Sequence, residues 1–271
     1  MKNLKYSVLL LVAVVLFSAC GTSRTVPITG RKQTLLVSDE EVLSLSNQEY
    51  SNYMKSAKKS TNAANTAMVQ RVGKNLANAV ETYLRSNNLS GELSQYSWEF
   101  NLVQDKNVNA FCMPGGKIVV YEGLLPVTVD EASLAVVLGH EIAHAVAKHS
   151  AEQMSNQLKQ QYGLQIGSSV LGALGMGQNT QSITQLIVQN GLQFRNLKYS
   201  REHETEADRM GLIFAAMAGY DPNVAVTFWQ RMAASSSNNT AEFLSDHPSD
   251  ATRIANIKNK FLPEALKYYR K

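Results

Sequence analysis

The segment His140-Glu141-Ile142-Ala143-His144 limits what this chain can fold into more than any other part of the sequence. Side chains four residues apart in an α-helix lie about 40° apart around the axis, so in a helix both imidazoles can point at one metal ion. Glu141 lies beside a metal ligand, where its carboxylate can reach a water on the metal. Upstream, Asp130 can cap a helix whose apolar stripe includes Leu134 and Leu138. The pattern predicts a helix with one buried face and a catalytic zinc site at its middle.

A second helix is predicted over residues 200–217, and it offers the remaining ligand. Metzincins continue the first motif with glycine and histidine three and six residues further on, where this chain has Ala147 and Ser150, so the third ligand must come from another segment. Glu204 and Asp208 lie four residues apart on one face, so Glu204 can bind zinc while Asp208 hydrogen-bonds a ligand imidazole. On spacing alone, two rivals remain, Glu202 and Glu206.

Two further histidines are predicted to lie outside the ligand set. If the first helix continues, His149 points about 140° away from His144, which indicates a capping or surface role. His203 is one residue off the ligand face of the second helix. In an alternative interpretation of the second helix, its glutamates bind no metal and only face the solvent. These glutamates are Glu202, Glu204 and Glu206.

Taken in order, these motifs resemble the gluzincin metallopeptidases that include HtpX, BepA and LoiP, relatives of the CAAX prenyl proteases. Three further segments fit that family, at residues 109–123, 218–222 and 247–253. The resemblance runs from about residue 40 to residue 260. It implies that Glu204 is the third ligand, because it stands four residues before Asp208. The implied site holds one zinc ion per chain, bound by His140, His144 and Glu204.

The chain also departs from these relatives. It ends soon after Arg253, which leaves no room for the helical repeat domain of BepA, and the body of the chain has no transmembrane span of the kind found in HtpX. A stand-alone lipoprotein form without a repeat domain is therefore expected.

The fold class predicted is α+β and mainly helical, a zincin-like metallopeptidase domain with a small sheet beside the zinc helix. Tyr96–Leu102 alternates with period two, and 108–112 and 117–121 read as short strands joined by a Pro-Gly-Gly turn. One exposed edge of this sheet could bind an extended peptide by strand addition. The glycine-rich run 163–177 is either a buried segment or a movable flap, and 234–240 is a polar loop.

The N-terminus predicts the compartment. Residues 1–19 have a basic start and an apolar run too short to cross a bilayer, and Ser18-Ala19-Cys20 resembles a bacterial lipobox. We therefore expect a signal peptide over 1–19, lipidation of Cys20, a membrane tether over 20–38 and a peptidase domain over 39–271. The expected location is the bacterial cell envelope, lipid-anchored in the outer membrane and facing the periplasm.

Charge and cysteine usage limit the partners. The chain has a net charge of +4, and removal of Lys2 and Lys5 with the signal peptide lowers it to +2, too little to indicate nucleic-acid binding. Lipidation of Cys20 would leave Cys112 without an intramolecular partner, and its apolar neighbours predict a packed thiol.

The predicted chemistry is zinc-assisted hydrolysis of peptide bonds in misfolded or mis-assembled cell-envelope proteins. Glu141 is the expected general base, and a second electrophile for the oxyanion is sought in His247 or Arg253. His247 could also approach the open position of the zinc and block it at rest, or merely cap or pack the final helix. Two other functions stay open, a chaperone-like protein with a structural zinc and zinc-dependent hydrolysis of another substrate. The intact Glu141 favours an enzyme, because a structural site needs no base.

Overall fold

The computed structural model describes residues 22–163, 193–234, 247 and 251–270. The predictions for the signal peptide 1–19, for Cys20, for residues 164–177 of the glycine-rich run and for most of the 234–240 loop lie outside these ranges. Within them, the prediction of a mainly helical α+β domain with a small sheet beside the zinc helix is confirmed.

A three-stranded sheet forms the centre of the molecule. Its strands are β3 (Glu99–Val103), β4 (Ala110–Met113) and β5 (Lys117–Tyr121), in the order β3-β5-β4. β5 runs parallel to β3 and antiparallel to β4, with Cys112 opposite Ile118. Gly115 and Gly116 make the turn between β4 and β5 at φ values of +87° and +80°, which favour glycine. The predicted hairpin is therefore correct to within two residues.

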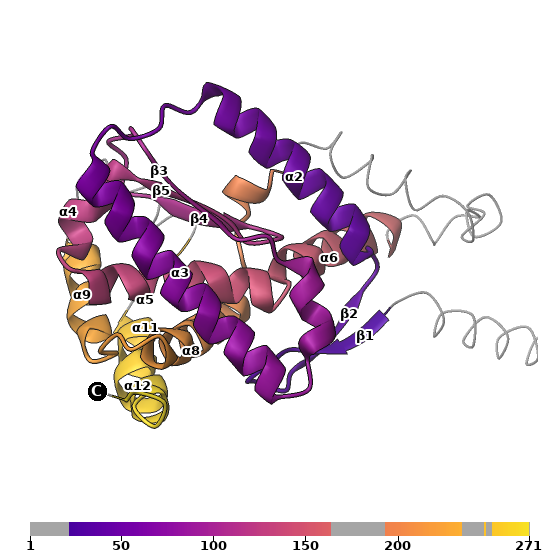
Figure 1. Ribbon diagram of the computed structural model, residues 1–271. Coiled ribbons are helices and arrows are strands. Elements are labelled where there is room, and N and C mark those ends of the chain that lie inside the picture. The colour runs from indigo at the N-terminus through magenta and orange to yellow at the C-terminus, as the bar shows by residue number, and fades with distance from the viewer. Residues whose placement is uncertain (1–21, 164–192, 235–246, 248–250, 271) are drawn as a thin grey trace, which may run out of the picture.

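Both faces of the sheet are buried, because alternate side chains belong to two different cores. On one face, α2 (Asp39–Ser56) and α6 (His149–Gly163) pack against Phe111, Met113, Val119 and Tyr121. On the other, α3 (Ala63–Ser86) and α5 (Glu131–Val146) pack against Ala110, Cys112, Ile118 and Val120. Figure 1 shows α2 and α5 on opposite sides of the strands.

The two edges of the sheet differ. Backbone hydrogen bonds from Ser60 to Leu102 (2.9 Å) and from Gln104 to Lys58 (2.7 Å) cover part of the outer edge of β3. No other strand in the described ranges pairs with the outer edge of β4. Because residue 109 forms the hydrogen-bonded pair with residue 121, the backbone groups of residue 112 point outward from β4.

The zinc helix α5 and the second motif helix α8 (Arg201–Met217) cross in close contact. The side chain of Asp130 accepts a hydrogen bond from Ser133 N at 2.7 Å and caps α5, as predicted. The side chain of Ser200 caps α8. At the crossing, a Cβ added to Gly139 would lie 2.6 Å from Gly211 O, so glycine at both positions lets the backbones touch.

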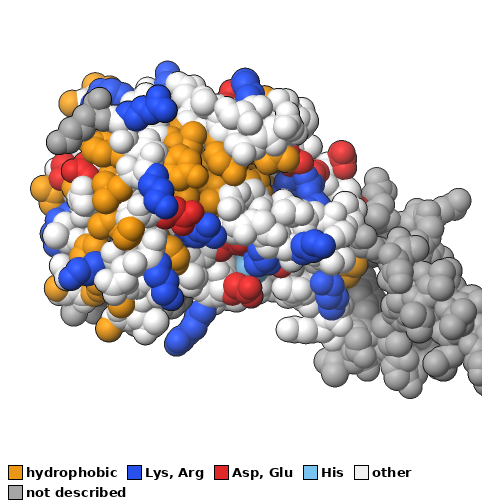
Figure 2. Space-filling view, turned by 90° about the horizontal axis from the view of Figure 1, so that it is seen from below, with side chains coloured by type: hydrophobic (Ala, Val, Ile, Leu, Met, Phe, Trp, Pro, Cys, Tyr) orange, Lys and Arg blue, Asp and Glu red, His pale blue; other side chains and the backbone are white. Residues whose placement is uncertain are grey.

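The remaining described helices pack against α5, α8 or one another. They comprise α4 (Leu125–Thr128), α9 (Val224–Ala234), α11 (Ala251–Asn256), a π-helical turn at Ile257–Phe261 and α12 (Leu262–Ala265). Short 3-10 turns lie at Ser90–Gln95, Glu122–Leu124 and Phe194–Asn196. Basic and acidic side chains are interspersed on the face seen from below (Figure 2).

Part of the segment 20–38, for which a membrane tether is predicted, is folded against the domain. Strands β1 (Thr22–Thr25) and β2 (Lys32–Leu35) form an antiparallel hairpin beside α6 (Figure 1). Val26 and Leu35 are buried in the two cores, and the side chain of Gln33 donates to Ala147 O at the end of α5 (3.1 Å). Exposed and buried residues alternate along β2. The segment consists mostly of polar and turn-forming residues, so this alternation could not be recognised from the sequence.

None of the helices described here is long and apolar enough to cross a membrane.

Candidate active site

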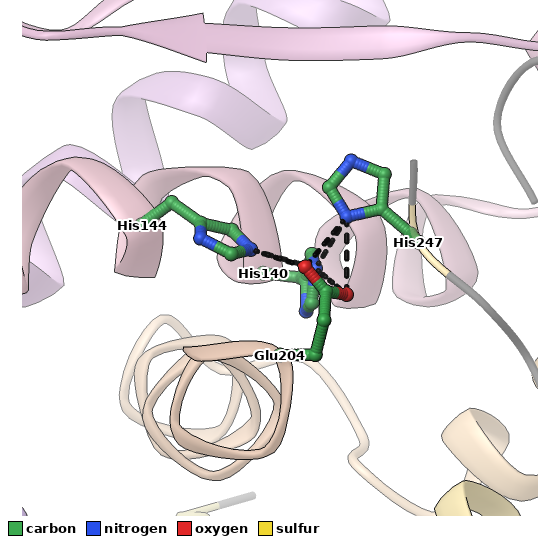
Figure 3. Close-up of side chains that lie close together, drawn as sticks. All are labelled: His140, His144, Glu204 and His247. Carbon is green, nitrogen blue, oxygen red and sulfur yellow. Dashed lines mark hydrogen bonds and ion pairs between the residues drawn. The ribbon is translucent and has the colours of Figure 1, made fainter. Parts of the chain in front are cut away.

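Four side chains from three segments converge at the centre of the molecule. Helix α5 contributes His140 and His144, α8 contributes Glu204, and His247 comes from the C-terminal region (Figure 3). The Nε2 atoms of His140 and His144 lie 3.1 Å apart, and each lies 3.3 Å from a Glu204 oxygen. His247 Nδ1 lies 3.2 Å from His140 Nε2 and 3.1 Å from Glu204 Oε2. One candidate ligand atom from each residue thus falls within 4.8 Å of the others.

The donor set fits a zinc ion. Three imidazole nitrogens and one carboxylate oxygen are ligands that zinc prefers, and four is its usual coordination number. All four residues are buried, so a cation would balance a carboxylate held away from water. Burial opposes ionisation of Glu204, but His247 and His140 beside it hold the pKa of this carboxyl well below its ordinary value. The site therefore presents an ionised carboxylate and two imidazoles of α5 to one point.

Glu141 lies beside this cluster with part of its hydrogen-bonding capacity unused. Its Oε1 is buried and has no hydrogen-bond partner within the described part of the chain, and it lies 3.4 Å from His247 Nε2. Burial raises the pKa of Glu141, while the nearby His247 and a hydrogen bond from the Cys112 backbone act in the opposite direction. This contact places the outer edge of β4 next to the cluster. A buried carboxylate with a raised pKa can both accept and release a proton.

Behind His140, a carboxylate and a guanidinium form a second layer. Asp208 Oδ1 lies 2.9 Å from His140 Nδ1, the contact predicted for it. Arg253 donates to both oxygens of Asp208, at 2.8 and 2.7 Å, and to His247 O at 3.2 Å. Its guanidinium also lies 3.5 Å from the ring centre of Trp229. These contacts favour a positioning role for Arg253 over the predicted contact with an oxyanion, because its donors are directed at Asp208.

The rivals for the third ligand lie elsewhere. Glu202 is exposed, and Glu206 is buried in a separate group with Arg31 and His149, so neither joins the candidate ligand cluster. The alternative that all three glutamates only solvate α8 is therefore wrong for Glu204 and Glu206. His203 also lies outside the cluster.

The prediction of a capping or surface role for His149 is wrong. His149 is fully buried, and its Nδ1 lies 2.8 Å from His144 Nδ1. The angle of about 140° assumed one continuous helix. Instead α5 ends at Val146, Lys148 adopts a left-handed φ of +54°, and His149 begins α6, which returns the imidazole to the metal-binding helix.

Sequence reasoning also missed Tyr199 and Arg31. The ring of Tyr199 stacks on His144 with ring centres 4.1 Å apart, and its hydroxyl hydrogen-bonds Ser150 Oγ at 2.9 Å. In the sequence, only the position of Tyr199 just before the N-cap residue of α8 could have indicated that it lies near the site. Arg31 carried no signal, because it lies far from every motif in the sequence.

Fold and site together define a zinc metallopeptidase of the gluzincin type, with two histidines on one helix and a glutamate on the next. A model of the family described as Peptidase family M48 matches residues 63–260, and the chain belongs to this family. M48 metallopeptidases are zinc-dependent, which confirms the predicted cofactor. Family membership and the curated relatives support the predicted metalloendopeptidase.

Curated relatives refine the resemblance. The chain is 38% identical to mitochondrial metalloendopeptidase OMA1 of Schizosaccharomyces pombe over 175 residues, which cover 64% of this chain and 49% of that protein. It is 33% identical to human OMA1 over 247 residues, 89% of this chain and 46% of the relative. The beta-barrel assembly-enhancing protease of Escherichia coli is 29% identical over 168 residues, 60% of this chain and 34% of the relative. The chain thus spans about half the length of the OMA1 proteins, which it resembles more than it resembles the E. coli protease.

The predicted location in a bacterial outer membrane is contradicted. The OMA1 proteins of Schizosaccharomyces pombe, Arabidopsis and human, at 38%, 37% and 33% identity, are all named as mitochondrial. A lipobox-like sequence is a short local pattern, and its resemblance could not decide the compartment. Nothing in the comparisons supports the lipid anchor expected at Cys20.

Proposed function

We propose that this chain is a zinc metalloendopeptidase that hydrolyses peptide bonds of misfolded or mis-assembled proteins. The observation that carries the proposal is the ligand cluster with the buried Glu141 carboxylate at its side. A general base next to three zinc ligands is needed for hydrolysis and serves no purpose in a purely structural site.

In the proposed mechanism, His140, His144 and Glu204 hold the zinc. When bound, zinc supplies Lewis acidity, which makes water nucleophilic at neutral pH and polarises a carbonyl. Glu141 accepts the proton of the attacking water and passes it to the leaving amine, and its raised pKa suits this double task. Asp208, held by Arg253, keeps the Nδ1–H of His140 in place, so that Nε2 faces the metal.

The outer edge of β4 supports a peptide in extended conformation as the substrate. Backbone groups of Cys112 point outward from the sheet, and Cys112 N–H already reaches Glu141. A substrate strand added here would bind through main-chain hydrogen bonds, which are available only in unfolded or mis-assembled segments and do not depend on side chains. We define the substrate class by its conformation rather than by a compartment, because the prediction of cell-envelope substrates depended on the N-terminal location signal.

His247 fits a resting-state role. Its Nδ1 lies among the three candidate ligands and its Nε2 lies beside Glu141, where a water or a substrate carbonyl would have to enter. A neutral imidazole is a good zinc ligand near neutral pH. We therefore favour the version in which His247 completes the coordination at rest over the version in which it stabilises the oxyanion.

The same geometry favours one second candidate function. A closed set of four protein ligands is typical of structural zinc sites, so a chaperone-like protein with a largely structural zinc would also present this cluster. The two functions differ in whether Glu141 is needed.

The full chain should be incubated with an unfolded protein, with and without a zinc chelator, beside Glu141→Gln. We expect internal cleavage that stops with chelator and returns with zinc. Glu141→Gln should keep one zinc per chain and lose activity by roughly 10²–10⁴-fold, because only the base is removed. Cleavage at the wild-type rate in this variant would remove Glu141 as the general base. No cleavage by the wild type despite bound zinc would favour the chaperone-like function.

Metal content tests the ligand assignment separately. His140→Ala, His144→Ala and Glu204→Ala should each release most of the zinc. Glu202→Ala is the matched control. This exposed glutamate lies on the same helix as Glu204 but outside the cluster, so the variant should keep the metal. Full zinc retention in Glu204→Ala would remove Glu204 from the proposed ligands.

A further inference from the structure

The two metal-binding histidines of α5 are held at their far ring nitrogens by two different networks. His140 contacts Asp208 directly, and Arg253 holds Asp208. His144 contacts a second histidine, His149, at 2.8 Å between the two Nδ1 atoms. His149 Nε2 in turn lies 2.9 Å from Glu206 Oε2.

Arg31 closes the second network. Its Nε and Nη2 donate to Glu206 Oε2 at 2.9 and 2.7 Å, and its Nη1 and Nη2 donate to the two oxygens of Glu152 at 2.8 and 2.7 Å. The hydroxyl of Thr29 also donates to Glu206. Each α5 histidine is therefore backed by a carboxylate that an arginine holds, but His144 is reached through an intervening imidazole.

Hydrogen-bond chemistry gives this chain of contacts one direction. If His144 binds zinc through Nε2, its proton lies on Nδ1 and is donated to His149 Nδ1. His149 must then carry its own proton on Nε2, which it donates to the ionised carboxylate of Glu206. The opposite arrangement would leave two acceptors facing each other at 2.9 Å. Glu206 thus selects the ring tautomer of both histidines.

Arg31 comes from a part of the chain that the family model does not match. Arg31 lies in the N-terminal hairpin, before the residues 63–260 that match the family model. Ile28 in the same turn has a φ of +65°, which a β-branched residue rarely adopts. Such strain persists only where surrounding contacts hold the backbone. Here Ile28 N–H donates to the Tyr83 hydroxyl at 3.1 Å, and Thr29 and Arg31 on its C-terminal side contact Glu206.

We propose that His149 and Arg31 are positioning residues of the metal centre, which orient His144 through the chain Arg31–Glu206–His149–His144. This inference rests on the proposed function in one respect, that His144 is a zinc ligand. It assigns to the N-terminal hairpin a part in zinc binding that lies outside the family motifs.

The test measures zinc loss from the loaded full chain into excess chelator, and the thermal unfolding midpoint of the zinc-free chain. His149→Ala should weaken zinc binding by roughly 10–100-fold, the usual effect of losing a partner of a metal-bound histidine. His149→Asn should restore most of it, because the Asn oxygen can accept the proton of His144 Nδ1. His149→Gln places its polar group toward Glu206 and should restore little.

Arg31→Ala should also speed zinc loss, and Arg31→Lys should not rescue it, since a lysine cannot bind two carboxylates as a fork. Arg24→Ala is the matched control. Arg24 lies in the same hairpin and also binds two carboxylates, Asp39 and Glu92, which bind Lys148 and not a ring nitrogen of His144 or His149. This control should lower the unfolding midpoint and keep the wild-type rate of zinc loss.

Wild-type zinc loss in His149→Ala would overturn the inference while leaving the proposed function intact. Equal zinc loss in the Ala, Asn and Gln variants, in step with their unfolding midpoints, would assign His149 a purely structural role and overturn it as well. A wild-type chain that binds no zinc would instead overturn the proposed function, and this inference with it.

Discussion

At the scale of single residues, the site is a set of buried polar groups whose hydrogen bonds are almost all used. His140, His144, Glu204 and Asp208 each contact another site residue, and the exception is Glu141, whose Oε1 is left without a hydrogen-bond partner in the described chain. Leaving a buried carboxylate oxygen unsatisfied is costly, so such an atom marks a place where chemistry needs it.

His247 is the residue whose replacement should change activity upward. If His247 is the fourth zinc ligand at rest, only a fraction of the molecules can bind substrate at the metal. His247→Ala should therefore raise basal cleavage. The increase should be roughly 10-fold if about 10% of the wild-type molecules are open. Zinc content should stay near one per chain, because three ligands remain. Initial rates on an unfolded protein measure the effect. A lower rate with zinc retained would mean that His247 stabilises the transition state instead.

At the scale of elements, the crossing of α5 and α8 sets the distance between the histidine pair and Glu204. Gly139 and Gly211 meet at this crossing, and neither position has space for a side chain. The helices can therefore approach closely enough for a glutamate one helix away to reach both imidazoles, at 3.3 Å from each.

Gly211→Ala should disturb both stability and metal binding. The added Cβ would lie 2.6 Å from His140 N and 2.8 Å from His140 Cα, so α8 must move away from α5. Overpacking of this kind costs about 1–3 kcal/mol, and the helix propensity of alanine offsets about 1 kcal/mol of it. We expect a lower free energy of unfolding in denaturant and faster zinc loss. Gly91→Ala, which meets nothing within 4 Å, is the control. Equal zinc retention in the two variants would contradict this account of the crossing.

At the scale of the whole molecule, the N-terminal hairpin joins helices that are far apart in the sequence. Arg31 of the hairpin binds Glu152 of α6, which also lies 3.1 Å from His203 of α8. Burial raises the pKa of Glu152, but the hydrogen bonds from Arg31 and His203 outweigh it and lower the pKa from 4.5 to about 2.

This ion pair predicts a stability that depends on pH. A carboxyl with a lowered folded-state pKa stabilises the fold above its ordinary value and loses that contribution as the pH falls from about 4.5 towards 2. In zinc-free protein, Glu152→Gln should therefore be less stable than the wild type at pH 7, and the difference should shrink towards pH 2. Unfolding in urea at several pH values measures it. A difference that stays constant over this range would show that the charge of Glu152 does not contribute.

Local pattern alone was enough to predict the zinc helix with its Asp130 cap, the second motif helix and the hairpin of β4 and β5. Helical spacing put His140 and His144 on one face, and Glu204 and Asp208 on another, because side chains four residues apart share a face wherever a helix forms. The resemblance then chose Glu204 over Glu202 and Glu206, a choice that matches the observed cluster.

Only the tertiary structure decided what surrounds these residues. The break at Lys148 turns His149 back onto His144, the packing of α11 brings Arg253 to Asp208, and the docked hairpin brings Arg31 to Glu206. Spacing along the chain cannot predict these contacts. Hydrogen bonds act over about 3 Å, and whether two groups come that close depends on how helices pack across the whole molecule.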